Sequence, residues 1–105
     1  MKRIILILAL LLITSCTSQD AIQNNPLEVN IQNFNFSPSE LTVKAGETVT
    51  WTNNDNTPHT VTGEGFSSET LDGGQSFSYA FAEPGIYEYH CNFHSSMKGR
   101  IIVTS

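Results

Sequence analysis

Residues 48–53, with the sequence TVTWTN, decide the fold class. Val49, Trp51 and Asn53 fall on one side of an extended chain and the threonines fall on the other, as in a β-strand with one buried face. The same period of two returns in short segments separated by turn residues, at 27–36, 41–43, 59–63, 77–81, 87–91 and 99–104. Since no helical periodicity competes with this alternation, we predict an all-β fold, an antiparallel sandwich of two sheets with seven or eight strands.

The composition limits the classes of function that are open to the chain. Its 105 residues fit one domain, and its formal charge of −5 offers no basic stripe that could neutralise phosphates. We therefore expect no nucleic-acid binding. Three histidines are too few for a multinuclear copper centre, and the sequence contains no GxxxxGK, HExxH or GxSxG motif. The protein is accordingly predicted not to be an enzyme.

The N-terminal residues 1–15 have the pattern of an export signal peptide. Lys2 and Arg3 precede an unbroken apolar run over residues 4–13, and small residues follow. As a helix this run would extend about 15 Å, half the thickness of a bilayer core, so a permanent transmembrane helix is the weaker alternative. We predict that the leader is removed and that the mature protein is extracytoplasmic.

The string ITSC at residues 13–16 resembles the lipobox of bacterial lipoproteins, in which the cysteine is acylated and becomes the mature N-terminus. Cys16 would then anchor a periplasmic or cell-surface lipoprotein to a membrane without spanning it. The alternative is ordinary signal cleavage, which would leave a reactive thiol in an oxidising compartment. Residues 16–26 are polar and aperiodic, and they are predicted to be a lipid-anchored N-terminus and tether for a folded domain at 27–105.

A single cysteine dominates the chemistry of the folded domain. With Cys16 assigned to the anchor, Cys91 is the only thiol that remains, so the domain has no partner for a disulfide. His94 and Met97 follow it in the motif CxxHxxM, and Met97 is the only methionine beyond the leader. A soft thiolate, an imidazole and a thioether are ligands that copper prefers. A short loop can also carry these three residue types by accident.

His59 supplies a second imidazole. It follows a proline at the point where strand pairing resumes, which places it at a sheet end where two neighbouring strands can each contribute a ligand. Together with Cys91 and His94 it would form a trigonal plane for one copper ion, with Met97 as a weak axial ligand. His90 neighbours Cys91, so alternation along the strand turns it outward, and we predict that it is not a ligand.

These four predicted ligands resemble those of the small blue copper proteins, the cupredoxins, and the spacing is similar to the short ligand loop of amicyanin rather than the longer loop of plastocyanin. The stretches that carry the resemblance are 40–62, ELTVKAGETVTWTNNDNTPHTVT, and 83–103, EPGIYEYHCNFHSSMKGRIIV. With the first strand included it covers nearly all of residues 27–104. The resemblance implies an eight-stranded Greek-key sandwich with a type 1 copper site at one end. It also implies electron exchange through His94 and an apolar docking surface around it, to which we expect Phe93 to belong.

Two residues depart from these relatives. Thr60 stands where plastocyanin and amicyanin carry an asparagine whose side chain ties the two ligand loops together, so the sequence leaves that link open. Ser95 stands where amicyanin has proline, which leaves the stiffness of the loop and the acid behaviour of His94 open as well.

These features predict a membrane-tethered type 1 (blue) copper protein, a monomer that shuttles single electrons between extracytoplasmic redox partners. Two other functions remain open: a copper-delivery or storage lipoprotein with the same ligands, and a metal-free surface β-sandwich for adhesion or assembly. A storage protein would carry several Met or His clusters, whereas the chain beyond the leader has one methionine. The acidic balance either keeps the protein soluble or steers a basic redox partner such as a c-type cytochrome.

Overall fold

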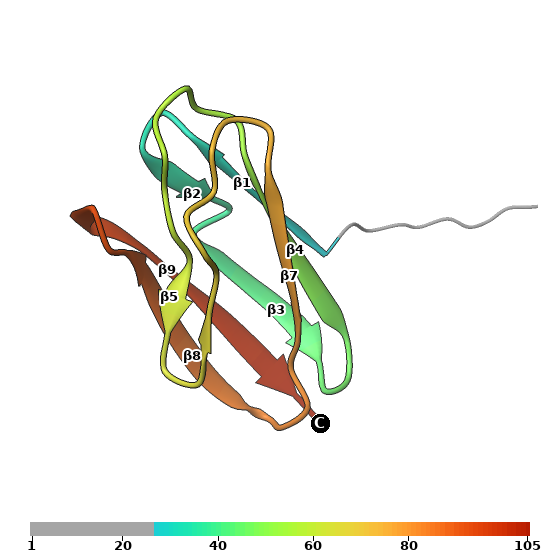
Figure 1. Cartoon of the computed structure of the whole chain (residues 1–105). Helices are drawn as coiled ribbons and strands as arrows, with labels where there is room; N and C mark the ends of the chain where they lie inside the picture. The colour runs from blue at the N-terminus through green and yellow to red at the C-terminus, as the bar shows by residue number, and fades with distance from the viewer. Residues whose placement is uncertain (1–26) are drawn as a thin grey trace, which may run out of the picture.

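The computed structural model describes residues 27–105, which form nine strands and no helix (Figure 1). The strands are β1 (Glu28–Gln32), β2 (Asn35–Ser37), β3 (Glu40–Lys44), β4 (Thr48–Asn53), β5 (Thr62–Gly63), β6 (Phe66–Ser67), β7 (Ser76–Ala80), β8 (Gly85–Cys91) and β9 (His94–Thr104). The predicted signal peptide 1–15, the lipidation site Cys16 and the tether 16–26 lie outside the described residues. In the part of the chain that is described, no helix is long and apolar enough to cross a membrane.

The strands form two sheets that pack against each other (Figure 1). One sheet has the strand order β2-β1-β4-β7, and the other has the order β3-β9-β8-β5-β6. The predicted all-β sandwich is therefore confirmed. The count of nine strands includes β5 and β6, each only two residues long, and so agrees roughly with the seven or eight predicted.

Two strand pairs run parallel, whereas the alternation pattern predicted antiparallel pairing throughout. β1 pairs with β4 and β3 pairs with β9 in this way. For β1 and β4 the cause lies between β2 and β3, where the chain passes from one sheet to the other without reversing its direction (Figure 1). It reverses at the turn around Gly46, so that β4 returns in the direction of β1. The strands that pair in parallel are thus separated in the chain by other strands.

The core confirms the inward faces that the alternation predicted. Trp51 is fully buried at its centre, and its ring centroid is 5.4 Å from that of Tyr89 in the opposite sheet. Burial of each large apolar side chain stabilises the fold by about 1.5–3 kcal/mol. The buried hydrophobic residues are Val29, Ile31, Phe36, Val43, Val49, Trp51, Val61, Phe66, Leu71, Phe81, Tyr89, Cys91, Met97, Ile101 and Val103. Within residues 27–105, the indole N–H of Trp51 and the hydroxyl of Tyr89 are buried without a hydrogen-bond partner.

A turn after β1 shifts the phase of the alternation. Val29 and Ile31 point into the core, and so does Phe36, whereas Phe34 is 47% exposed. Asn33 and Phe34 both adopt the left-handed backbone conformation, with φ of 55° and 59°, and reverse the chain between β1 and β2. Phe34 is therefore not a core residue, although the alternation grouped it with Phe36, and its ring packs instead against two histidines.

Candidate metal centre

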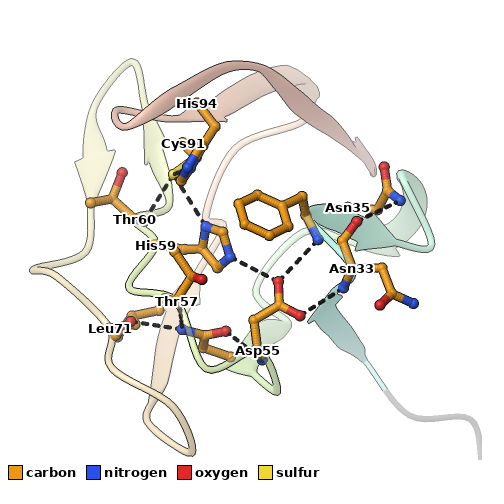
Figure 2. Close-up of polar contacts among 11 residues, drawn as sticks. Asn33, Asn35, Asp55, Thr57, His59, Thr60, Leu71, Cys91 and His94 are labelled. Carbon is orange, nitrogen blue, oxygen red and sulfur yellow. Dashed lines mark hydrogen bonds and ion pairs between the residues drawn. The ribbon is translucent and has the colours of Figure 1, made fainter.

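Three of the four predicted ligands converge where β8 turns into β9 (Figure 2). His59 comes from the segment between β4 and β5, where it pairs with Leu71 through backbone hydrogen bonds of 3.1 and 2.8 Å. Cys91 Sγ lies 3.6 Å from Nδ1 of His59 and 3.7 Å from Nδ1 of His94. The three ligand atoms all lie within 4.8 Å of one another, which is close enough for them to bind a single metal ion.

The site is closed on the side of the core. His59 and Cys91 are fully buried and Met97 is 3% exposed, whereas His94 is only partly buried. Cys91 is a free cysteine, and Met97 lies in β9 together with His94. His94 is therefore the ligand candidate through which the site reaches the surface.

The loop that carries His59 is shaped by Asn53, the last residue of β4. The buried side-chain amide donates to the carbonyl oxygens of Thr57, at 2.9 Å, and Leu71, at 2.8 Å. Its Oδ1 accepts a hydrogen bond of 2.9 Å from the backbone N–H of Asp55. Side-chain hydrogen bonds of this kind replace the strand ladder and fix the course of the loop. The alternation predicted that Asn53 faces inward, but gave no indication that it supports the ligand loop.

Thr60 ties the two ligand loops together. Its backbone N–H donates to Sγ of Cys91 at 3.4 Å, and its hydroxyl oxygen accepts a hydrogen bond of 2.9 Å from the backbone N–H of Asn92. The threonine hydroxyl and N–H thus supply the link between the ligand loops that the sequence left open. The N–H directed at the sulfur is suited to a thiolate ligand, because the hydrogen bond stabilises negative charge.

Asp55 contacts a predicted ligand, although it was not among the predicted site residues. Its Oδ2 is 2.9 Å from Nε2 of His59, on the side of the ring that faces away from Cys91 (Figure 2). Oδ1 accepts the backbone N–H of Asn33 at 2.7 Å, and Oδ2 accepts that of Phe34 at 3.0 Å. Burial by itself would raise the pKa of this carboxyl, but the hydrogen bonds from Phe34, His59 and Asn33 outweigh it and lower the pKa below its ordinary value. Asp55 is therefore charged at neutral pH.

Two exposed aromatic rings lie beside the histidines. The ring centroid of Phe34 is 5.2 Å from that of His59 and 4.8 Å from that of His94, in edge-to-face contact with both. Phe93 is 54% exposed, and its ring centroid is 6.5 Å from that of His94. Of these two residues, only Phe93 was predicted from the sequence to lie in an apolar surface around His94. The buried residues of β1 are at odd positions, Val29 and Ile31, whereas the buried Phe36 is at an even position. This change in the alternation is the signal that could have pointed to a turn at Phe34.

His90 is not part of the cluster. It is exposed, as alternation along β8 predicted, and its Nε2 lies 3.1 Å from the side-chain oxygen of Asn92. The donors that do converge are a cysteine sulfur and two imidazole nitrogens, with a buried methionine in the adjoining strand. This combination of soft and borderline ligands fits copper in either oxidation state.

Comparison with known proteins agrees with this fold. A family model described as the cupredoxin-like domain matches residues 3–103. The chain belongs to the cupredoxin-like family. It is 37% identical over 94 residues to amicyanin-alpha of Methylorubrum extorquens, a match that covers 80% of this chain and 79% of the relative. A plastocyanin of Scenedesmus fuscus is 40% identical over 83 residues, which cover 65% of this chain and 85% of the relative.

Solved cupredoxin structures superpose well on the protein. A purple cupredoxin from Nitrosopumilus maritimus has a TM-score of 0.70 and 32% identity, and the match covers 73% of this chain and 98% of the other. An oxidized amicyanin variant has a TM-score of 0.71 and 31% identity, with coverage of 78% and 85%. Another amicyanin variant, solved in its Cu(I) form, has a TM-score of 0.70 and 32% identity, with the same coverage.

Proposed function

We propose that this cupredoxin carries single electrons between redox proteins outside the cytoplasm, using one copper ion held by His59, Cys91, His94 and Met97. The observation that carries the proposal is the convergence of the Cys91 sulfur with two imidazole nitrogens, at 3.6 and 3.7 Å. The amicyanins and plastocyanins to which the chain is similar are electron carriers rather than enzymes.

The surroundings of the donors suit repeated gain and loss of one electron. Copper bound here would supply the Cu(I)/Cu(II) couple, for which two imidazoles, a thiolate and a weak thioether are a compromise between the two states. Asn53 and Thr60 hold the ligand loops through hydrogen bonds with the backbone. Donors held in this way move little when the charge of the metal changes.

Electrons would enter and leave through the imidazole of His94, the least buried of the four residues. Phe34 and Phe93 beside it are 47% and 54% exposed. Exposed apolar side chains gathered at one place are typical of a protein-docking surface, because their contact with a partner excludes water. A redox partner docked on them would lie close to His94.

The charge of the folded domain favours a basic partner. Lys44, Lys98 and Arg100 are the only Lys and Arg residues in 27–105, and Arg100 is paired with Glu40 at 3.7 Å and with Glu88 at 3.0 Å. A basic redox protein such as a c-type cytochrome would therefore be attracted at long range. Rates of electron exchange with it should fall as the ionic strength rises, because salt screens exposed charges.

The location follows from the N-terminal pattern. We infer that residues 1–15 are removed on export and that acylated Cys16, followed by the tether up to residue 26, anchors a monomeric domain to a membrane. The variant Cys16→Ser should then appear in the soluble fraction. Persistent attachment of that variant to membranes would count against lipidation.

Loading the purified protein with Cu(II) tests the copper site. We expect one copper per chain and an intense blue colour, which Cys91→Ser should abolish and His90→Ala should leave unchanged. A protein that stays colourless, or that binds no copper, would contradict the proposal and leave the metal-free surface sandwich. Loss of the metal on repeated reduction and oxidation would instead indicate delivery or storage.

A further inference from the structure

Asp55 occupies a position between the predicted ligand His59 and the turn that carries Phe34. Its side chain is only 10% exposed, and its two oxygens contact the Nε2 atom of His59 and two backbone N–H groups. Asp55 is the only charged residue in the loop 53–58, whose other residues are asparagine, threonine and proline. The role of this carboxylate therefore has to come from its contacts.

The contact with His59 selects one form of the imidazole ring. An ionised carboxylate can only accept hydrogen bonds, so Nε2 must carry the ring proton to be held at 2.9 Å. In the neutral ring the other nitrogen, Nδ1, then keeps its lone pair, and it points toward Cys91 Sγ, 3.6 Å away. That is the nitrogen which the metal requires, because imidazole binds metals through the unprotonated nitrogen.

The hydrogen bonds from Asn33 and Phe34 to Asp55 place a second group, the ring of Phe34, against His59 and His94. Asn33 and Phe34 adopt the left-handed backbone conformation, which is unfavourable for a bulky residue such as Phe34 because its Cβ approaches the following carbonyl oxygen. The carboxylate compensates by accepting the backbone N–H groups of both residues, at 2.7 and 3.0 Å. The ring of Phe34 is thereby held edge-on against His59 and His94.

We propose that Asp55 is a positioning residue for the metal centre, which presents Nδ1 of His59 to copper and stabilises Cu(II) relative to Cu(I) through its negative charge. This inference rests on the proposed copper-carrier function. One imidazole ring separates the carboxylate from the metal-facing nitrogen, and the pair is shielded from water. The charge therefore acts at short range in an environment where screening is weak.

The variant Asp55→Asn removes the charge and keeps the size of the side chain. Loss of the carboxylate partner of a metal-binding histidine typically costs 10- to 100-fold in metal affinity. We expect the ratio of Cu(II) affinity to Cu(I) affinity to fall at least tenfold, which raises the reduction potential by at least about 59 mV for one electron. Asp55→Glu, which restores the carboxylate, should recover most of this shift while the blue colour persists in all three proteins.

Asp72→Asn is the matched control. It removes the same charge from an exposed position, where the hydrogen bonds made by Asp72 involve only its backbone N–H and carbonyl groups. Its potential should stay close to that of the wild type. If Asp55→Asn and Asp72→Asn have equal potentials, Asp55 supports the loop and does not tune the metal, and the proposal is wrong.

If the Asp55→Asn variant does not fold, the position of the His59 ring proton in the wild-type protein tests the same proposal. In the ¹⁵N NMR spectrum of the metal-free protein, the ring proton of His59 should lie on Nε2 and exchange slowly with water. A proton on Nδ1, or a ring proton that exchanges rapidly, would overturn the proposal. This readout does not depend on copper, so it separates a failure of the Asp55 assignment from a failure of the carrier function.

Discussion

Replacing Thr60 by valine would remove one hydrogen-bond acceptor from the link between the ligand loops at nearly constant side-chain volume. In the wild type, Oγ1 of Thr60 accepts the backbone N–H of Asn92 at 2.9 Å and shares a 3.0 Å hydrogen bond with the hydroxyl of Thr62. Thr60 is 4% exposed, so water has little room to replace the lost hydroxyl. The backbone N–H of Thr60, which donates to the sulfur of Cys91, remains in place.

The expected loss of stability follows from these contacts. An unpaired buried donor costs about 1–3 kcal/mol, and a lost neutral hydrogen bond costs about 0.5–1.5 kcal/mol. Asn92 is exposed at the turn between β8 and β9, so its N–H can turn partly toward water and the cost should lie near the lower end, at about 1–1.5 kcal/mol. Since about 1.4 kcal/mol is a factor of ten in an equilibrium constant, the amide of Asn92 should exchange with solvent about tenfold faster.

Urea unfolding of the metal-free protein measures the free energy of unfolding, and hydrogen exchange followed by NMR measures the Asn92 amide. Thr62→Val is the matched control, because it removes the hydroxyl pair with Thr60 and leaves Asn92 bonded. Equal stability of the Thr60→Val and Thr62→Val variants, together with an unchanged exchange rate at Asn92, would refute the assignment of the Thr60 hydroxyl as the link.

Three further predictions concern the core, the surface and the axial ligand. Burial raises the pKa of Tyr89 to about 12, so the unfolded chain releases this proton near pH 10 while the native state keeps it. The free energy of unfolding should therefore fall between about pH 10 and pH 12, by roughly 1.4 kcal/mol per pH unit, and urea titrations of Tyr89→Phe should lack this component. Phe93→Ala should slow electron exchange with a basic cytochrome about fivefold or more in stopped-flow measurements, since large aromatic side chains dominate docking. Ile86→Ala, which truncates a residue that is 64% exposed at the start of β8, should leave that rate unchanged, and equal effects of the two variants would exclude the patch beside His94. Met97→Gln should keep the blue colour and lower the reduction potential in voltammetry, and an unchanged potential would remove Met97 from the axial position.

The strands of this protein were predictable because their signal is local. In β4, inward and outward side chains alternate from Thr48 to Asn53, and the structure buries Val49, Trp51 and Asn53 as expected. The parallel pairing of β1 with β4 was not predictable in the same way. It depends on the chain passing from one sheet to the other after β2 without reversing its direction. The alternation of side chains within a strand does not indicate the direction in which that strand runs relative to its neighbours.

In the candidate metal centre, too, some residues were predictable from local sequence patterns and others were not. Cys91, His94 and Met97 stand within one short motif, and together with His59, which was found from its place at the start of a strand, they predicted copper. The carboxylate of Asp55 gave no such signal, and Phe34 gave only the phase shift between the inward residues of β1 and Phe36. Asp55 meets its backbone partners 21 and 22 positions away, across a left-handed turn whose course the polar sequence around it does not reveal.

The predictions of the β-sandwich and of the four candidate metal donors came from local features of the chain, namely the period-two alternation, the spacing of CxxHxxM and the position of His59 directly after a proline. The surroundings of those donors depend instead on contacts between residues that lie far apart in the chain. The hydroxyl of Thr60 closes on the N–H of Asn92, 32 positions away, and Asp55 orients His59 while it holds the turn of Phe34. Such contacts depend on how two sheets and their loops are placed against each other, and that placement results from the packing of the whole core around Trp51.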